Sequence, residues 1–373
     1  MAKRVFNNAN VLCGDFQFRL TDLVIEDGMI LSVGTSTEPG GEDLGGAYVI
    51  PGLVDIHTHG CNGGDHLDGN AEKTRDICTH MASVGTTSVL ATIMTQSKEV
   101  MLKAAKNVAE CKGKTGGAHL RGIYLEGPFF TEKYKGAQHP DYLMDADRDF
   151  FRALQEASGN MVKIMSLAPE RPGAVELIPQ MAPARAFMGH TNASYEEAKA
   201  AVDAGATGLT HTFNGMVGLH HRNPGVIAAA WENEKVFCEC ICDGFHVNPA
   251  MVNLLYRHVG KDRFCVISDS LRPAGLPDGR YESGGQPITV SGGKAYLDGG
   301  VIAGSTTCML EEVRNLVSWG IMPLEDAVYC ASAVPAKAAG IFDRVGSVEP
   351  DKVADLLILD QDLTLRETIL GAE

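Results

Sequence analysis

Two histidines, one residue apart, close the segment PGLVDIHTHG, which runs from Pro51 to Gly60. The apolar and mostly β-branched residues before them predict a short strand that is buried on both faces. Side chains two positions apart on a strand point to the same side, so His57 and His59 can present both imidazole rings to one point. Such a pair is typical of a metal site. Taken alone, the triplet fits a turn with two solvated rings equally well.

Further polar residues close or follow five more predicted strands. The segments are YLE, FMGH, LTH, CDGFH and VISD, and their last residues are Glu126, His190, His211, His246 and Asp269. In a barrel of parallel strands the carboxyl ends share one face, so these residues should converge with the two histidines. Each of them alone could be a turn, cap or loop residue. Their coincidence at equivalent ends of successive strands favours a functional site.

Imidazoles and carboxylates at one barrel mouth suit a borderline divalent ion such as zinc, iron or manganese. Such an ion lowers the pKa of a bound water to about 7 and polarises a carbonyl oxygen. Asp269 could take the proton of that water and return it to a leaving amine, which is the course of amide hydrolysis. His246 could polarise or hydrogen-bond the substrate.

A cationic loop, His220 to Arg222, follows the strand that ends at His211. In an otherwise acidic chain, Arg222 could hold a phosphate or a carboxylate through its fork of donors. A solvated loop arginine is the alternative. Four other histidines match no strand end, and we expect them at the surface: His66, His80, His119 and His258.

Strands and helices alternate through the middle of the chain, which predicts an α/β fold with a (β/α)8 TIM-type barrel over residues 49–344. The expected strands lie near 49–57, 86–93, 120–126, 161–167, 185–190, 207–211, 235–242 and 263–269. The expected helices lie near 71–84, 98–110, 147–158, 173–181, 195–204, 223–233, 248–260, 305–318 and 324–339. A doubly wound open sheet is the alternative, because periodicity alone cannot close a barrel. The glycine-rich stretch from Gly275 to Gly304 reads as a hairpin inserted after the eighth strand.

Short alternating segments at both chain ends predict small strands. Each set is too small to be stable alone. We therefore expect residues 1–48 and 345–373 to pair into one small β-sandwich domain, with the barrel inserted between them.

Composition narrows the class of protein. The 373 residues carry a formal net charge of −15 and are 45% hydrophobic, which argues against nucleic acid or an anionic membrane surface as a partner. We find no run of signal-peptide or transmembrane length. The ten cysteines form no CxxC pair and sit mostly in apolar runs, which favours core residues in a reducing cytoplasm. These features predict a cytoplasmic enzyme or binding protein.

Several segments together resemble the N-acetylglucosamine-6-phosphate deacetylases of the amidohydrolase superfamily. They are HTH after PGLVDI, LEGPFF, GHTNASYEEA, THTFNGM, DGFHV and SDSLRPAGLPDG. The HxH motif marks only the superfamily, whereas LEGPF, GHTNA and the DGFHV to AGLPDG block are more specific. The resemblance runs over nearly the whole chain. It implies hydrolysis of N-acetyl-D-glucosamine 6-phosphate to D-glucosamine 6-phosphate and acetate.

Carried over residue by residue, the resemblance makes Glu126, His190 and His211 the ligands of the main metal and Asp269 the catalytic acid/base. His57 and His59 are both present, so the pattern permits one ion or two, with zinc first and iron or manganese as alternatives. No lysine stands at a strand end to be carboxylated, and Glu126 takes its place.

The resemblance also implies the substrate contacts, from His246, the backbone around Asn214 and Gly215, and Arg222. In relatives the phosphate contact comes from the neighbouring subunit, which implies a homodimer. Gln138 stands where some members carry a substrate-contacting histidine, which leaves the sugar preference open. The alternatives are a deacetylase of another N-acylated sugar phosphate, such as N-acetylgalactosamine 6-phosphate, and a non-catalytic protein with the same fold.

Overall fold

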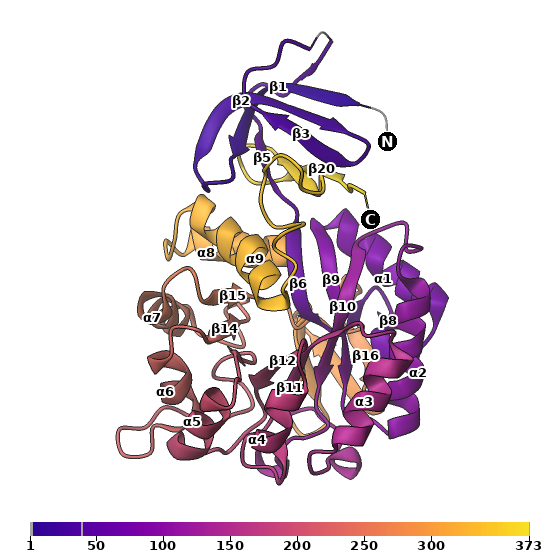
Figure 1. Ribbon diagram of the computed structural model, residues 1–373, viewed down its shortest axis with the longest axis vertical. Helices are drawn as coiled ribbons and strands as arrows, with labels where there is room; N and C mark the ends of the chain where they lie inside the picture. The colour runs from indigo at the N-terminus through magenta and orange to yellow at the C-terminus, as the bar shows by residue number, and fades with distance from the viewer. Residues whose placement is uncertain (1–2, 39, 373) are drawn as a thin grey trace.

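Strands from both ends of the chain form one sheet in the computed structural model, which describes residues 3–38 and 40–372. The strand order is β20-β19-β5-β1-β2-β3, with β4 beside β1. Figure 1 shows this sheet, in indigo and yellow, at one end of the molecule, above the barrel. Both chain ends therefore contribute strands to a separate sheet, as the fold prediction requires. The strands are β1 (Arg4–Leu12), β2 (Phe18–Glu26), β3 (Met29–Val33), β4 (Glu42–Asp43), β5 (Tyr48–Pro51), β19 (Leu356–Leu359) and β20 (Leu365–Ile369).

Eight parallel strands form the barrel, and they follow one another in sequence order without a reversal. A doubly wound sheet reverses its order at a switch point, so this topology excludes that alternative. Hydrogen bonds at the carboxyl end join the first strand to the segment after the last: the amide of Asp269 donates to the carbonyl of His57 at 2.9 Å. The strands are β6 (Leu53–Thr58), β9 (Thr86–Met94), β10 (His119–Glu126), β11 (Val162–Leu167), β12 (Arg185–Met188), β13 (Gly208–Leu209), β14 (Phe237–Cys240) and β15 (Phe264–Val266).

Helices occupy every segment where the sequence predicts them. Capping residues explain several of the starts: in the fifth helix Ser194 and Glu197 form a capping box. The helices are α1 (Ala71–Ser83), α2 (Lys98–Cys111), α3 (Arg148–Ala157), α4 (Ala174–Leu177), α5 (Tyr195–Asp203), α6 (Gly225–Glu232), α7 (Pro249–Val259), α8 (Met309–Ser318) and α9 (Leu324–Ala339). No helix in the described ranges has both the length and the apolar character needed to cross a bilayer.

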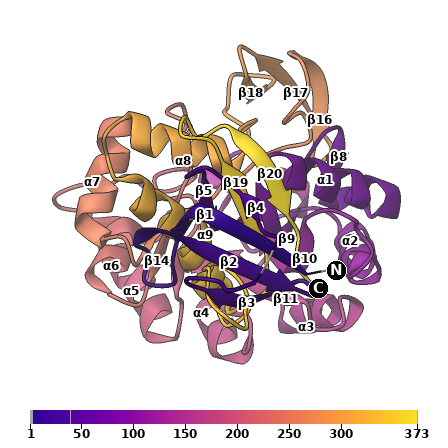
Figure 2. The ribbon, with the colours of Figure 1, turned by 90° about the horizontal axis from the view of Figure 1, so that it is seen from above.

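Two sequence predictions need correction. The strand expected over 49–57 is two strands, because the chain passes at Gly52 from β5 in the terminal sheet to β6 in the barrel. The hairpin expected within 275–304 is a three-stranded sheet of β16 (Gly279–Ser283), β17 (Gln286–Ser291) and β18 (Lys294–Leu297). Its first strand alternates exposed and half-buried residues, so it lacks the apolar pattern that marks a strand in sequence. Figure 2 shows this sheet at the margin of the barrel.

The path of the chain fixes which end of the barrel is free. Since β5 leads directly into β6, the terminal sheet adjoins the amino end of that strand (Figure 1). Asp355, just before β19, reinforces this junction through Arg121 at 3.1 Å and His119 at 3.2 Å, both on β10. The carboxyl ends of the barrel strands therefore point away from the terminal sheet.

Candidate metal centre and its pocket

The candidate ligands lie where barrel strands end. Glu126 is the last residue of β10 and His57 lies within β6, while the others follow their strands closely. The backbone of His190, His211 and Asp269 takes the left-handed conformation, with φ of 44°, 26° and 49°. Non-glycine residues adopt this region rarely, and it turns each side chain out of the strand direction. All of these side chains are buried.

One group of donors consists of Glu126, His190 and His211. Oε1 of Glu126 lies 2.9 Å from Nε2 of His190 and 3.1 Å from Nε2 of His211, and the two Nε2 atoms are 3.1 Å apart. The other ring nitrogens face backbone carbonyls, of Tyr134 at 2.8 Å and of Asn214 at 3.1 Å. A carbonyl can only accept, so both Nδ1 atoms carry the proton and, in the neutral rings, both Nε2 atoms present lone pairs. Three electron-pair donors this close together fit a shared cation.

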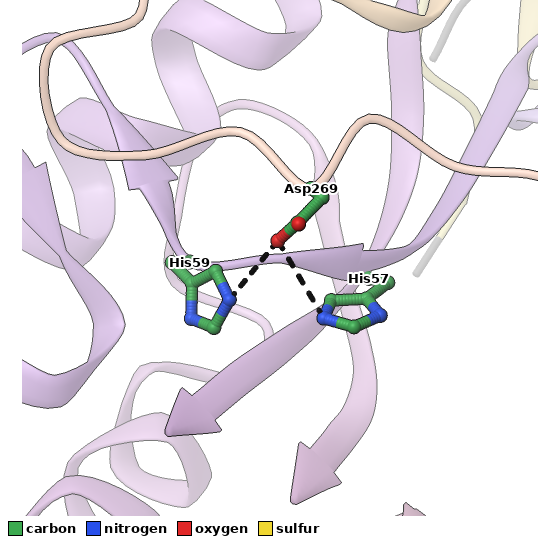
Figure 3. Close-up of side chains that lie close together, drawn as sticks. All are labelled: His57, His59 and Asp269. Carbon is green, nitrogen blue, oxygen red and sulfur yellow. Dashed lines mark ion pairs between the residues drawn. The ribbon is translucent and has the colours of Figure 1, made fainter. Parts of the chain in front are cut away.

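The second group consists of His57, His59 and Asp269 (Figure 3). Oδ1 of Asp269 lies 3.2 Å from Nε2 of His59 and 3.6 Å from Nε2 of His57. Nε2 of His57 is buried and has no hydrogen-bond partner in the described part of the chain. This group, too, has the residue types and the spacing of a divalent-metal site.

Glu126 connects the two groups. Its Oε1 faces His190 and His211, whereas its Oε2 lies 3.3 Å from Nε2 of His59. Burial would raise the pKa of Glu126, but its close contacts with the ring nitrogens of His190, His211 and His59 hold it well below its usual range. Burial likewise would lower the pKa of His59, but Asp269 and Glu126 raise it well above its usual value. The buried carboxylates thus attract positive charge, and the residues fit one cation or a bridged pair.

A pocket of about 400 Å³ opens over these donors. Its wall includes Gln138, Asn214, Gly215 and His246, so the structure brings these predicted substrate-binding residues to the metal groups. The side chain of Gln138 is already hydrogen-bonded within the chain: Nε2 donates to Oε2 of Glu126 at 2.6 Å, and Oε1 accepts from the amide of Thr95 at 3.0 Å. Its side chain therefore supports a candidate metal ligand.

Arg222 does not line this pocket. It is exposed on the loop after His211, and its Nη1 lies 2.9 Å from Nε2 of His221. With Lys133 and Tyr195 it lines a separate hollow of about 550 Å³. Within one chain, the predicted phosphate ligand and the candidate metal centre therefore line different pockets.

Sequence reasoning missed one carboxylate next to the centre. Glu239 in β14 is fully buried, and its Oε2 lies 3.0 Å from Nδ1 of His57 and accepts from the amide of His211 at 3.0 Å. A charged residue inside an otherwise apolar barrel strand was the available signal.

Two of the four histidines expected at the surface are buried, so that prediction was wrong for them. His66 is fully buried, and burial lowers its pKa to about 3. His119 is buried against Asp355, which comes from the other end of the chain. His258 is exposed, as expected, and His80 is half-buried.

Most of this chain matches the model of one protein family. The model of the amidohydrolase family matches residues 48–372. The chain is 37% identical over 356 residues to N-acetylglucosamine-6-phosphate deacetylase of Bacillus subtilis, over 92% of this chain and 90% of that protein. It is 36% identical over 357 residues to N-acetylgalactosamine-6-phosphate deacetylase of Escherichia coli O157:H7, over 95% of this chain and 93% of that protein.

Solved structures of N-acetylglucosamine-6-phosphate deacetylases also resemble this chain. The crystal structure of N-acetyl-D-glucosamine-6-phosphate deacetylase from Mycobacterium smegmatis superposes with a TM-score of 0.93 at 33% identity and covers 99% of both chains. That of N-acetylglucosamine-6-phosphate deacetylase from Pasteurella multocida also gives 0.93, at 26% identity, and covers 99% of this chain and 98% of that one. This chain therefore belongs to the amidohydrolase family and, within it, to the group that contains the N-acetylglucosamine-6-phosphate deacetylases.

Proposed function

We propose that this chain hydrolyses the acetamide of N-acetyl-D-glucosamine 6-phosphate, giving D-glucosamine 6-phosphate and acetate. The observation that carries the proposal is the pair of buried donor groups, bridged by Glu126, with Asp269 facing the pocket above them. The relatives supply the substrate class, since several act on an N-acetylated hexosamine 6-phosphate.

Glu126, His190 and His211 would hold the main divalent ion, and His57, His59 and Asp269 would complete a second position. Nitrogen and oxygen donors with few ligands favour zinc over the harder cations, with iron and manganese as alternatives. A divalent ion at this place acidifies a coordinated water and polarises a carbonyl oxygen.

Asp269 is the proposed acid/base. Its carboxylate lies at the pocket, and His59 and His57 orient it at 3.2 and 3.6 Å. Burial would raise its pKa, but the hydrogen bond to His59 and the charge of His57 hold the pKa below its usual value. It is therefore ionised at neutral pH and can accept the proton of the attacking water. Returning that proton to the amine nitrogen allows the C–N bond to break.

His246 is the proposed ligand for the sugar. Its Nδ1 donates to Oδ2 of Asp243 at 2.6 Å, and its Nε2 is buried at the pocket without a hydrogen-bond partner in the described ranges. In that tautomer Nε2 can accept a hydrogen bond from a sugar hydroxyl. The backbone at Asn214 and Gly215 lines the same wall and would contact the acetamide.

Arg222 is the proposed phosphate ligand, supplied by the partner subunit of a homodimer. Its place outside the pocket of its own chain supports this arrangement. A cytoplasmic location is also proposed, and ten cysteines without a disulfide support it.

The test is acetate release by the metal-loaded protein from N-acetylglucosamine 6-phosphate, its galactosamine epimer and the unphosphorylated sugar. We expect preference for the first compound, and an Asp269→Asn variant should lose about 10²- to 10⁴-fold in kcat because the proton acceptor is gone. Equal use of the epimer would favour the second candidate function, which the 36% identical galactosamine relative supports. A metal-loaded protein that releases no acetate from any of the three would refute deacetylation.

A further inference from the structure

Glu239 is the carboxylate that sequence reasoning missed, and it lies beneath both metal groups. It belongs to β14, and its side chain has no exposed surface. Oε2 lies 3.0 Å from Nδ1 of His57 and also 3.0 Å from the backbone nitrogen of His211. Oε1 has no hydrogen-bond partner in the described residues. One side chain thus touches a member of each donor group.

The contact with His57 sets the state of its ring. A carboxylate accepts the proton of Nδ1, so in the neutral ring Nε2 carries the lone pair, and Nε2 faces Glu126 and Asp269. The ring also stacks on Tyr124, with centroids 4.5 Å apart and planes at 28°. Nδ1 therefore keeps its proton, and Glu239 and Tyr124 fix the direction of the ring before any ion binds.

The contact with His211 supports an unfavourable backbone. His211 has a φ of 26°, and its amide points back into the barrel to Glu239. That hydrogen bond holds the turn that aims the His211 ring at Glu126. Without an acceptor at this point, a buried amide would lack its partner at the place where the chain leaves β13.

The charge of Glu239 also needs compensation. Among the described residues, its ion pair is with His57, and the next carboxylates toward the pocket are Glu126 and Asp269. A buried carboxylate is costly unless a cation lies close to it. A divalent ion held by Nε2 of His57 would supply that charge through the imidazole ring.

We propose that Glu239 is a positioning residue that couples the two metal groups, and that its negative charge raises the affinity of the ion held by His57. The proposal rests on the proposed function only in requiring a divalent ion at this centre. It assigns Glu239 no contact with substrate.

The experiment compares Zn²⁺ affinity of metal-stripped wild-type protein and Glu239→Gln by competition with a chromophoric chelator, and counts the ions that remain after dialysis. The amide has the same shape and keeps an acceptor for His211, so the substitution removes mainly the charge. We expect about a 10- to 100-fold loss of affinity, the usual effect of losing the partner of a metal-bound histidine. Glu312→Gln is the control for the change of side chain without the loss of a charge, because Glu312 is equally buried and accepts the amide of Cys242, while burial raises its pKa well above its usual value.

A double-mutant cycle shows whether Glu239 acts through His57. In a His57→Ala background, Glu239→Gln should change the Zn²⁺ affinity less than about 3-fold, because the coupling is gone. The proposal is overturned if Glu239→Gln lowers the Zn²⁺ affinity as much in the His57→Ala background as in the native one. It is also overturned if Glu239→Gln leaves the affinity of the native protein unchanged. Nitrogen NMR of the zinc-loaded native protein needs no variant: His57 must carry its proton on Nδ1, and a proton on Nε2 would contradict the proposal.

These readouts are independent of deacetylation. Loss of affinity in Glu239→Gln together with no acetate release by wild type would refute the proposed function and leave the role of Glu239 intact. Normal acetate release by wild type together with unchanged metal affinity of Glu239→Gln would support the proposed function and refute the role of Glu239.

Discussion

Three candidate site residues hold backbone conformations that side chains other than glycine seldom adopt. His190, His211 and Asp269 have positive φ, and such residues cost on the order of 1–3 kcal/mol each. The surrounding hydrogen bonds hold them there, for example those from the amide of His211 to Glu239 and from the amide of Asp269 to the carbonyl of His57. These strained residues lie where several side chains must point to the same place.

Gly215 packs closely against His190, and a substitution can test what this contact contributes. It has a φ of 59°, and a Cβ there would lie 2.8 Å from Nδ1 of His190 and 3.3 Å from the carbonyl oxygen of Tyr134. We expect Gly215→Ala to push the His190 ring from its partner, lower divalent-metal affinity by about 10-fold or more, and cost about 1–3 kcal/mol of stability. Chelator competition and thermal unfolding measure the two effects.

Gly218→Ala is the control for this prediction, since a Cβ at Gly218 would meet nothing within 4 Å and its φ lies outside the left-handed region. If Gly215→Ala bound metal as tightly as that control, the close packing of Gly215 on His190 would not contribute to metal binding.

At the level of single residues, the sequence predicts what depends on strand direction and misses what depends on distant partners. Glu126, His190 and His211 follow from their places at strand ends, because parallel strands bring those ends together. His119 needed Asp355, more than two hundred residues away, to be recognised as buried. Glu239 lies between two cysteines in a buried strand, and no local pattern shows that His57 is its partner.

Secondary-structure elements near the site are shorter than their apolar patterns predict. The strand expected over 207–211 is Gly208–Leu209, and the one over 263–269 is Phe264–Val266. The chain leaves the sheet early because His211 and Asp269 turn into the left-handed region. Helices, whose ends carry capping residues such as Ser194, were predicted more closely.

The junction between the terminal sheet and the barrel depends on one buried carboxylate. Asp355 accepts from the amide of Gly371 at 2.9 Å and pairs with Arg121 and His119. We expect Asp355→Ala to lower the free energy of unfolding by about 3–5 kcal/mol, since it leaves the largely buried guanidinium of Arg121 without its carboxylate partner. Urea titration measures the loss.

Asp355→Asn keeps an acceptor for Gly371, so its loss should be smaller than that of alanine. Both variants should bind Zn²⁺ as wild type does once folded, because Asp355 lies at the opposite end of the barrel from the metal groups. Equal unfolding curves for Asp355→Ala and wild type would contradict the structural role of this junction.

At the scale of the whole molecule, the order of strands and helices is enough to predict the barrel and the paired chain ends. The pattern cannot show how far apart two loops lie, and Arg222 illustrates this limit. It follows His211 closely in sequence, yet it lines a different hollow from the one that contains Asp269. The proposed role of Arg222 therefore places it in the pocket of another copy of the chain.

The last prediction tests that arrangement with heterodimers. Arg222→Ala should raise KM for the phosphorylated substrate far more than for the neutral sugar, because a bidentate contact to phosphate is lost. Two subunits, one carrying Arg222→Ala and the other Asp269→Asn, are co-expressed with different tags and purified together. One of the two sites then combines an intact Asp269 with the partner's intact Arg222, so about half of the wild-type activity should return.

The control heterodimer carries both substitutions in one subunit and none in the other. If Arg222 acts across the interface, neither site of this control is complete and its activity should stay near that of the single variants. If Arg222 acts within its own chain, the pattern reverses, with about half activity in the control and none in the first heterodimer. A protein that stays monomeric in solution would exclude the shared site altogether, because no partner subunit would be present to supply Arg222.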